Sequence, residues 1–168
     1  GILLVLTNLG ENRKLNLQQA FLLTALSWFS IAIFGCIPFL LSELNLSFVD
    51  AFFESMSGIT TTGSTIIINL DNAPKSILIW RAILQWLGGI GIIVMAITIL
   101  PLLNIGGMQL FRTESSDTAE KILPKTREIT LIISIIYLTL TFVCGAAYWL
   151  VGMNIFDSIA HSMTTIAT

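Results

Sequence analysis

The chain has 168 residues, of which 55% are hydrophobic and 11% are charged, and its formal net charge is −2. A soluble domain usually carries about 25% charged residues, so this composition excludes an ordinary water-soluble domain and favours an integral membrane protein. The near balance of basic and acidic residues argues against a nucleic-acid partner. No group of Cys, His and carboxylate residues has the spacing of a metal site.

Three apolar segments are long enough to cross a bilayer as helices, for which about 20 residues are needed. They cover residues 17–41, 77–103 and 129–151. Cys36 and Cys144 fall inside these segments, so we expect small packing residues and no disulfide. We interpret residues 1–14 as the end of a preceding helix and a linker. Because the chain lacks an initiator Met and stops at Thr168 without a polar tail, we interpret it as an internal fragment.

The basic residues predict the orientation of the spans, because cytoplasmic loops are enriched in Lys and Arg. Most of them precede the first span or lie between the second and third: Arg13, Lys14, Arg112, Lys121, Lys125 and Arg127. We therefore expect these two segments in the cytoplasm and residues 42–76 outside. Lys75 and Arg81 do not follow this rule, and we expect Arg81 to snorkel to the interface or to pair with an acidic residue.

The connection between the first two spans contains a further apolar stretch at residues 48–59. A stretch of this length is too short to cross and is typical of a re-entrant or interfacial helix. We expect Ser47 or Asp50 to cap its start and the helix to end near Gly58. The predicted order is span, half-helix, polar loop, span.

A related sequence recurs later in the chain. Residues 50–61 (DAFFESMSGITT) and 157–168 (DSIAHSMTTIAT) share Asp, Ser, Met, Ile and Thr at matching positions, with an offset of 107 residues from Asp50 to Asp157. Each copy follows an apolar span. Internal repeats of membrane proteins usually assemble with pseudo-symmetry around a shared site. We expect Asp50 and Asp157 to be helix caps rather than ion ligands.

The polar loop after the first half-helix, residues 60–65 (TTTGST), lies among apolar segments. Irregular backbone at membrane depth is tolerated where it lines water or is buried in protein. Carbonyl and hydroxyl oxygens replace the water shell of a monovalent cation, whereas a divalent ion prefers carboxylates, and this loop has none. We expect Glu54, which lies earlier on the half-helix, to anchor that helix instead of binding an ion.

Four stretches are more specific: SGITTTGS at 57–64, IWRAILQWLGGIG at 79–91, LPLLNIGGMQLFR at 100–112 and HSMTTIAT at 161–168. Together they resemble the Trk/Ktr/HKT superfamily of potassium transporters, and its TrkH-type membrane subunits in particular. The resemblance implies an all-α membrane protein with a potassium-channel-like pore, built from four span–pore helix–span repeats. Residues 15–111 would form the first repeat, 112–128 a cytoplasmic linker, and 129–168 a truncated second repeat.

The resemblance also implies site residues and a function. Thr61, Thr62, Gly63 and Ser64 would form the first filter strand, with Gly63 in the signature position, and Thr168 would match Thr61 in the second. The implied function is potassium uptake across the cytoplasmic membrane of a bacterium or archaeon, as a channel-like pore or as a symporter with Na⁺ or H⁺. The family further implies a homodimer, a cytoplasmic nucleotide-binding ring (TrkA-type) docked near the linker, and K⁺ as the transported ion with no cofactor.

Other interpretations concern single motifs. Residues 86–91 (WLGGIG) resemble a phosphate-binding loop, but their position inside an apolar span favours close helix packing. An intramembrane serine hydrolase, with Ser55, Ser57 or Ser64 as nucleophile and His161 as base, is an alternative function, as is a non-conducting scaffold. His161 takes the place of Glu54 in the repeat, and we expect a pore-helix residue bonded to its neighbours rather than a pH sensor.

Overall fold

The computed structural model describes residues 17–103 and 122–168, and all regular elements within these two ranges are helices. They are α2 (Leu17–Gly35), α3 (Ile37–Leu40), α4 (Phe48–Ile59), the 3₁₀ turn η1 (Leu70–Asn72), α5 (Lys75–Leu103), α7 (Ile122–Leu150) and α8 (Ile155–Ala167). The basic residues 13, 14, 112 and 121, on which much of the predicted orientation depends, lie outside the described residues.

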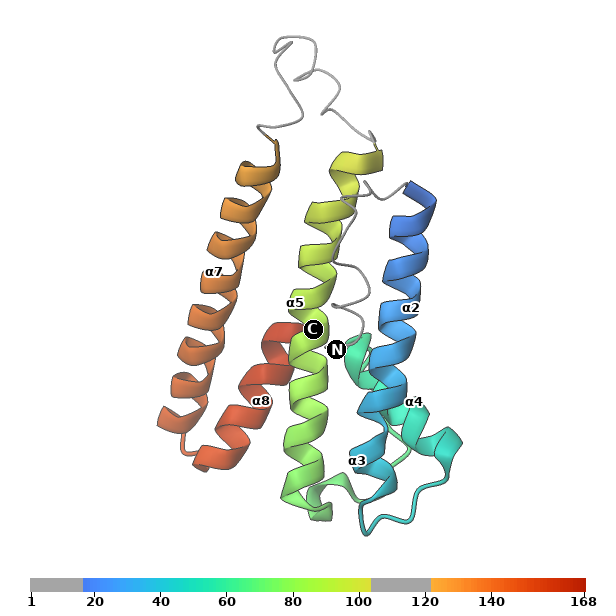
Figure 1. The fold of residues 1–168 in the computed structure, drawn as a ribbon. Coiled ribbons are helices and arrows are strands. Elements are labelled where there is room, and N and C mark those ends of the chain that lie inside the picture. The colour runs from blue at the N-terminus through green and yellow to red at the C-terminus, as the bar shows by residue number, and fades with distance from the viewer. Residues whose placement is uncertain (1–16, 104–121) are drawn as a thin grey trace, which may run out of the picture.

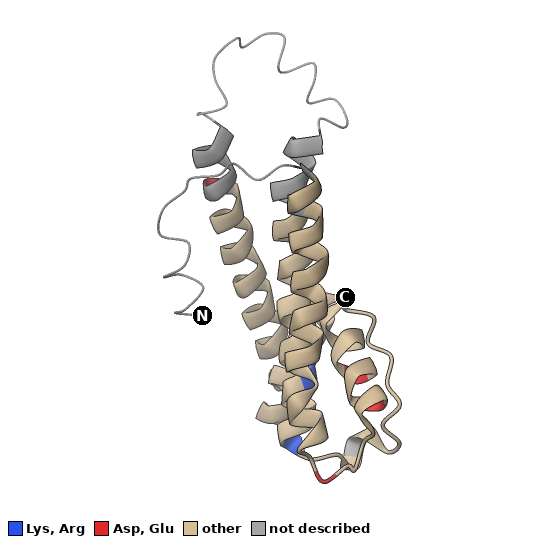
Figure 2. Cartoon of the chain, turned by 45° about the vertical axis from the view of Figure 1, so that its right-hand side comes forward, with Lys and Arg blue, Asp and Glu red and all other residues tan. Residues whose placement is uncertain are grey.

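Three of the described helices are long and apolar enough to cross a membrane, which confirms the three predicted spans. These stretches are Phe21–Leu40, Lys75–Ile97 and Glu128–Leu150. In Figure 1 the start of α2, the end of α5 and the start of α7 lie at one end of the bundle. Figure 2 shows that the spans carry little charge along most of their length, with charged residues near the lower end, on α4 and at the upper end of the bundle. The chain is therefore a membrane protein whose regular elements, in residues 17–103 and 122–168, are all helices.

The first and third spans differ from the prediction in detail. The first is interrupted between α2 and α3, where Pro38 has no amide hydrogen to donate to the preceding turn. In that turn the carbonyl of Gly35 accepts a hydrogen bond from the indole of Trp80, with a length of 2.9 Å. The third helix begins at Ile122 rather than at Ile129, because a helix can continue past the apolar segment through charged residues.

The two short helices, α4 and α8, both pack against α5, and each also contacts the span that precedes it, α2 or α7. The bounds of α4 match the predicted half-helix at residues 48–59. Figure 1 shows both short helices beside the lower half of α5, with the C-terminus of α8 near the middle of that helix. The structure therefore brings the two predicted repeats together on one shared helix.

The 107-residue offset relates the starts of α4 and α8 closely. Ser47 caps α4 and accepts from the amide of Asp50 at 3.2 Å, and Asn154 caps α8 and accepts from the amide of Asp157 at 2.9 Å. Both carboxylates bond back to the capping residue. The N-caps are therefore Ser47, one of the two candidates for α4, and Asn154, whereas Asp50 and Asp157 are the third residues of their helices and bond to the cap. The prediction that the aspartates themselves are the caps is wrong, because a side chain one turn earlier accepts from the first free amides. The shared arrangement extends the repeat from sequence to geometry.

Two further pairs of positions obey the same offset. Residues 45 and 152, which precede the two caps, both have a positive φ: 50° at Asn45 and 107° at Gly152. Ser55 and Ser162 are both buried, with 0% and 3% of their surface exposed. The chain thus enters each short helix through a similar backbone turn and buries the same face of it.

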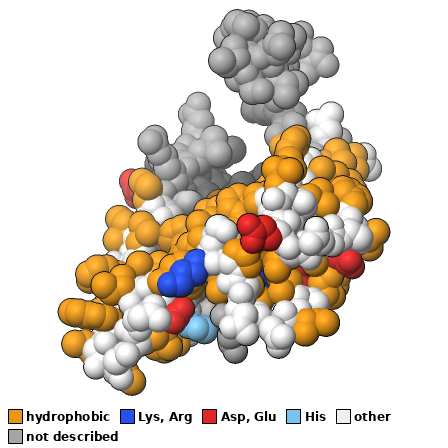
Figure 3. All heavy atoms as spheres, turned by 90° about the horizontal axis from the view of Figure 1, so that it is seen from below, with side chains coloured by type: hydrophobic (Ala, Val, Ile, Leu, Met, Phe, Trp, Pro, Cys, Tyr) orange, Lys and Arg blue, Asp and Glu red, His pale blue; other side chains and the backbone are white. Residues whose placement is uncertain are grey.

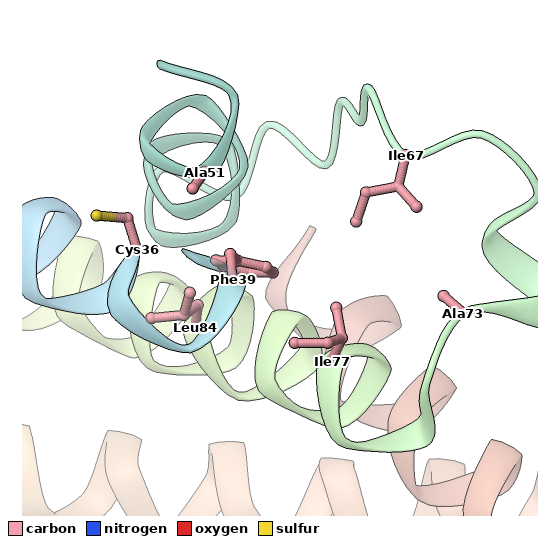
Figure 4. Close-up of a cluster of buried hydrophobic side chains, with 7 residues drawn as sticks. All are labelled: Cys36, Phe39, Ala51, Ile67, Ala73, Ile77 and Leu84. Carbon is pink, nitrogen blue, oxygen red and sulfur yellow. The ribbon is translucent and has the colours of Figure 1, made fainter. Parts of the chain in front are cut away.

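A small apolar core holds α4 in place. Figure 4 shows its residues, which come from the end of the first span, α4, α5 and the segment after the polar loop: Cys36, Phe39, Ala51, Ile67, Ala73, Ile77 and Leu84. Burial of these side chains fixes both ends of the connection between the first two spans. The polar loop lies between two anchored segments.

Candidate functional site

The loop at residues 60–65 turns back along α4, and several of its amides donate to carbonyls of that helix. The bonds are Thr60 N to Met56 O at 2.9 Å, Thr61 N to Gly58 O at 2.9 Å and Gly63 N to Ser57 O at 3.2 Å. The described peptides are all trans, so the carbonyl before each amide points the opposite way. The carbonyls of Thr60 and Thr62 are therefore directed away from α4. Sequence reasoning had left Thr60 outside the site.

Two loop residues have left-handed backbone conformations. Thr61 has a φ of 58° and Gly63 a φ of 74°, while Thr60 between helix and loop has a φ of −83°. A left-handed β-branched residue is rare, and such strain costs about 1–3 kcal/mol. A Cβ at Gly63 would find only the Gln85 amide, at 3.5 Å. The glycine is needed for its conformation and not for lack of space.

Glu54 anchors the far end of the loop. Its side chain is fully buried, and it accepts three hydrogen bonds: from Thr65 Oγ1 at 2.6 Å, from the Ile66 amide at 2.7 Å and from Arg81 Nε at 2.8 Å. The prediction that Glu54 is an anchor is confirmed, and so is the pairing of Arg81 with an acidic residue. The sequence did not show that the two predictions concern the same ion pair.

The hydroxyl groups of the site are also bound. Ser57 Oγ donates to the carbonyl of Ser64 at 2.6 Å, so the Ser64 carbonyl faces α4. Thr60 Oγ1 lies 2.8 Å from the Met56 carbonyl and 2.9 Å from Thr62 Oγ1. Thr62, Gly63 and Ser64 are exposed in this chain. The predicted site residues 61–64 thus lie beside α4, with residues 62–64 exposed. Hydrogen bonds to α4 fix the loop backbone on the side that faces that helix.

Thr168, the predicted second-repeat residue, meets the first repeat through α5. Gln85 Nε2 donates to Thr168 Oγ1 at 2.9 Å and is the atom that lies 3.5 Å from the Cβ position of Gly63. The structure therefore brings Gly63 and Thr168 to the same side chain. Sequence reasoning missed Gln85, although an uncharged polar residue within an apolar span was an available signal.

Adjacent glycines of α5 receive the ends of the two short helices. A Cβ at Gly88 would overlap the carbonyl of Ile59, the last residue of α4. A Cβ at Gly89 would lie 3.0 Å from Cα of Ala167 in α8 and 2.7 Å from the hydroxyl of Tyr137 in α7. The packing interpretation of WLGGIG is confirmed, because Gly88 and Gly89 lie inside α5 and pack against α4 and against α8 and α7, respectively.

The hydrolase alternative finds no support at these residues. Ser57 donates to the Ser64 carbonyl, and the buried Ser55 hydroxyl has no hydrogen-bond partner among the described residues. The His161 ring, on the other short helix, lies 6.3 Å from the Tyr148 ring, and the His161 carbonyl accepts from Thr164 at 3.0 Å. The histidine is exposed, and Figure 3 shows that the lower face of the bundle is largely hydrophobic with a few charged side chains among the apolar ones.

These features define a class: a membrane protein, helical in its described residues, in which two short helices and the polar loop after the first of them pack against a shared span. The profile of the TrkH family, described as "Cation transport protein", matches residues 3–168. The chain belongs to the TrkH family, which is a family of transporters and not of enzymes.

Individual relatives of this chain are consistent with its family membership. The Trk system potassium uptake protein TrkI of Halomonas elongata is 49% identical over 150 residues, which are 89% of this chain and 30% of that protein. TrkH of Escherichia coli K12 is 45% identical over 170 residues, 99% of this chain and 35% of that protein. The crystal structure of the potassium transporter TrkH from Vibrio parahaemolyticus aligns with a TM-score of 0.74 at 42% identity, covering 91% of this chain and 30% of that one. The chain spans about a third of the length of these relatives.

Proposed function

We propose that this chain is part of the pore-forming subunit of a Trk-type potassium uptake system, and that the loop after α4 is one segment of its selectivity filter. The observation that carries the proposal is the backbone of the loop. Its amides donate hydrogen bonds to carbonyls of α4. Its residues 61 and 63 have left-handed backbone conformations. The carbonyl oxygens of Thr60 and Thr62 thereby face away from α4, as a site for a dehydrated monovalent cation requires.

In this proposal Thr61, Thr62, Gly63 and Ser64 form the first filter segment and Thr168 begins the second. Gly63 supplies the backbone geometry, and carbonyls of the loop bind K⁺. Because the carbonyl of Ser64 has a donor in Ser57, the carbonyls of Thr60 and Thr62 are the stronger candidates for ligands. The loop itself has no carboxylate, which favours a monovalent over a divalent ion.

We further propose that α4 and α8 are re-entrant pore helices. Both are too short to cross, and their C-terminal ends meet α5 at adjacent glycines. The C-terminus of a helix carries partial negative charge, which stabilises a nearby cation by about 0.3–1 kcal/mol. Two such ends therefore favour a cation near the middle of α5.

We propose the wider assembly on the support of family membership. Residues 15–111 would be the first of four repeats, 112–128 a cytoplasmic linker and 129–168 the start of the second repeat, in a cell membrane with the connection between α3 and α5 outside. The complete protein would form a homodimer with a cytoplasmic nucleotide-binding ring (TrkA-type) near the linker. It would carry K⁺ without a cofactor, with or without coupling to Na⁺ or H⁺.

The test is Gly63→Ser in the complete protein, with K⁺ and Na⁺ uptake measured in proteoliposomes. We expect K⁺ discrimination to weaken, because a side chain strains the φ of 74° at this position. The matched control is Gly152→Ser, since Gly152 has a φ of 107° and open space around it but lies before α8. Equal selectivity in the wild type and Gly63→Ser would place the filter elsewhere, and transport of neither ion by the wild type would favour the scaffold.

A further inference from the structure

One side chain lies between the two proposed filter segments. Gln85 is 9% exposed, and its Nε2 donates to Thr168 Oγ1 at 2.9 Å. The same nitrogen lies 3.5 Å from the position that a Cβ on Gly63 would take. A single amide therefore contacts the second segment and closely approaches the glycine of the first.

The position of Gln85 on α5 explains this placement. Residues three and four positions apart on a helix share a face, so Gln85 shares one with Gly88 and Gly89. These glycines receive the ends of α4 and α8. The glycine pair brings the two short helices close to α5, and one turn away Gln85 lies near both Gly63, in the loop after α4, and Thr168, which follows α8.

The hydrogen bonds define the direction of this contact. Thr168 Oγ1 donates to the carbonyl of Thr164 at 2.6 Å, so the hydroxyl can accept from Gln85. The result is a chain from the Gln85 amide through the Thr168 hydroxyl to the backbone of α8. Such chains strengthen their members in a low dielectric, and a buried amide is costly without a partner.

We propose that Gln85 is a positioning residue that fixes the spacing between the first and second filter segments and thereby helps to determine which monovalent cation is transported. This inference rests on the proposed function, because Gln85 acts through Thr168 and Gly63 and does not bind the ion. Selectivity depends on the number and arrangement of the oxygens around the ion. A shift of one segment relative to the other changes that arrangement.

The experiment replaces the amide by an apolar group of similar size, Gln85→Met, in the complete protein. Thr168→Val and the double variant are measured beside it. The readout is the ratio of Na⁺ to K⁺ uptake in proteoliposomes, because loss of folded protein lowers both fluxes equally. We expect each single change to raise the ratio by a factor of about 5, which corresponds to one neutral hydrogen bond of about 1 kcal/mol. The double variant should raise it no further than the larger single effect.

Thr141→Val is the matched control. Its hydroxyl accepts from Trp86 Nε1 at 3.0 Å, so the change removes a comparable bond from α5 on the side of α7. Its ratio should equal that of the wild type. If Gln85→Met does not accumulate, Gln85→Leu replaces it, with the same expected shift.

The outcomes separate the two proposals. A changed ratio in Gly63→Ser with an unchanged ratio in Gln85→Met overturns the role of Gln85 and leaves the filter in place. An unchanged ratio in Gly63→Ser overturns the filter assignment itself. Full additivity of Gln85→Met and Thr168→Val contradicts the coupling through their hydrogen bond, as does an equal shift in Thr141→Val.

Discussion

The ion pair between Glu54 and Arg81 makes a quantitative prediction about the loop. Glu54 is fully buried and the Arg81 side chain is 15% exposed, so solvent screens the pair only weakly. Glu54→Gln keeps an oxygen for Thr65 and Ile66 but presents no charge to Arg81. Removing one partner of a buried ion pair costs about 3–5 kcal/mol, because the other charge remains in a medium of low dielectric. We expect a destabilisation of this size.

The assay is thermal unfolding of the purified complete protein in detergent, followed for Glu54→Gln, for Arg81→Met and for the double variant that combines them. Either single change should lower the unfolding temperature strongly. The double variant should recover most of the loss, since no unpaired charge remains and the amide oxygen introduced at position 54 still accepts from the loop. A wild-type unfolding temperature in Glu54→Gln would refute this reasoning, and so would a double variant that is less stable than both single ones.

Two further predictions concern the packing of α5 and the completeness of the pore. Gly88→Ala should greatly reduce the yield of monodisperse protein in size-exclusion chromatography, because its Cβ would overlap the Ile59 carbonyl, while Gly91→Ala should be tolerated, since its nearest neighbour is Trp28 at 3.7 Å. Equal yields would contradict the close approach of α4 to α5. Residues 1–168 expressed alone should not restore growth at low K⁺ to cells without potassium uptake, because the chain spans about a third of its relatives. Robust growth would contradict the need for further repeats.

The sequence was sufficient to predict those features that depend on neighbouring residues in the chain. Hydropathy located the three spans, and the bounds of α4 followed from the length of its apolar stretch and the polar residues around it. The repeat correctly indicated that both short helices begin just before Asp50 and Asp157, but the caps themselves are Ser47 and Asn154. The interruption at Cys36 was missed, although Pro38 is a local signal for it.

The contacts across the bundle were harder to predict. The sequence indicated that Gly88 and Gly89 allow close packing, but not that each receives a different short helix. It suggested a partner for Arg81 without showing that Glu54 also holds Thr65 and Ile66. Gln85 and Thr168 are far apart in the chain, and their contact depends on how α8 packs on α5. Such arrangements depend on tertiary geometry, which periodicity and composition do not encode.

Anomalous diffraction from crystals of the complete protein grown with Rb⁺ would test the central claim most directly. The proposal predicts a peak within coordination distance of the carbonyl oxygens at residues 60–63, on the side of the loop that faces away from α4. Rb⁺ peaks elsewhere in the protein, with none beside this loop, would contradict it.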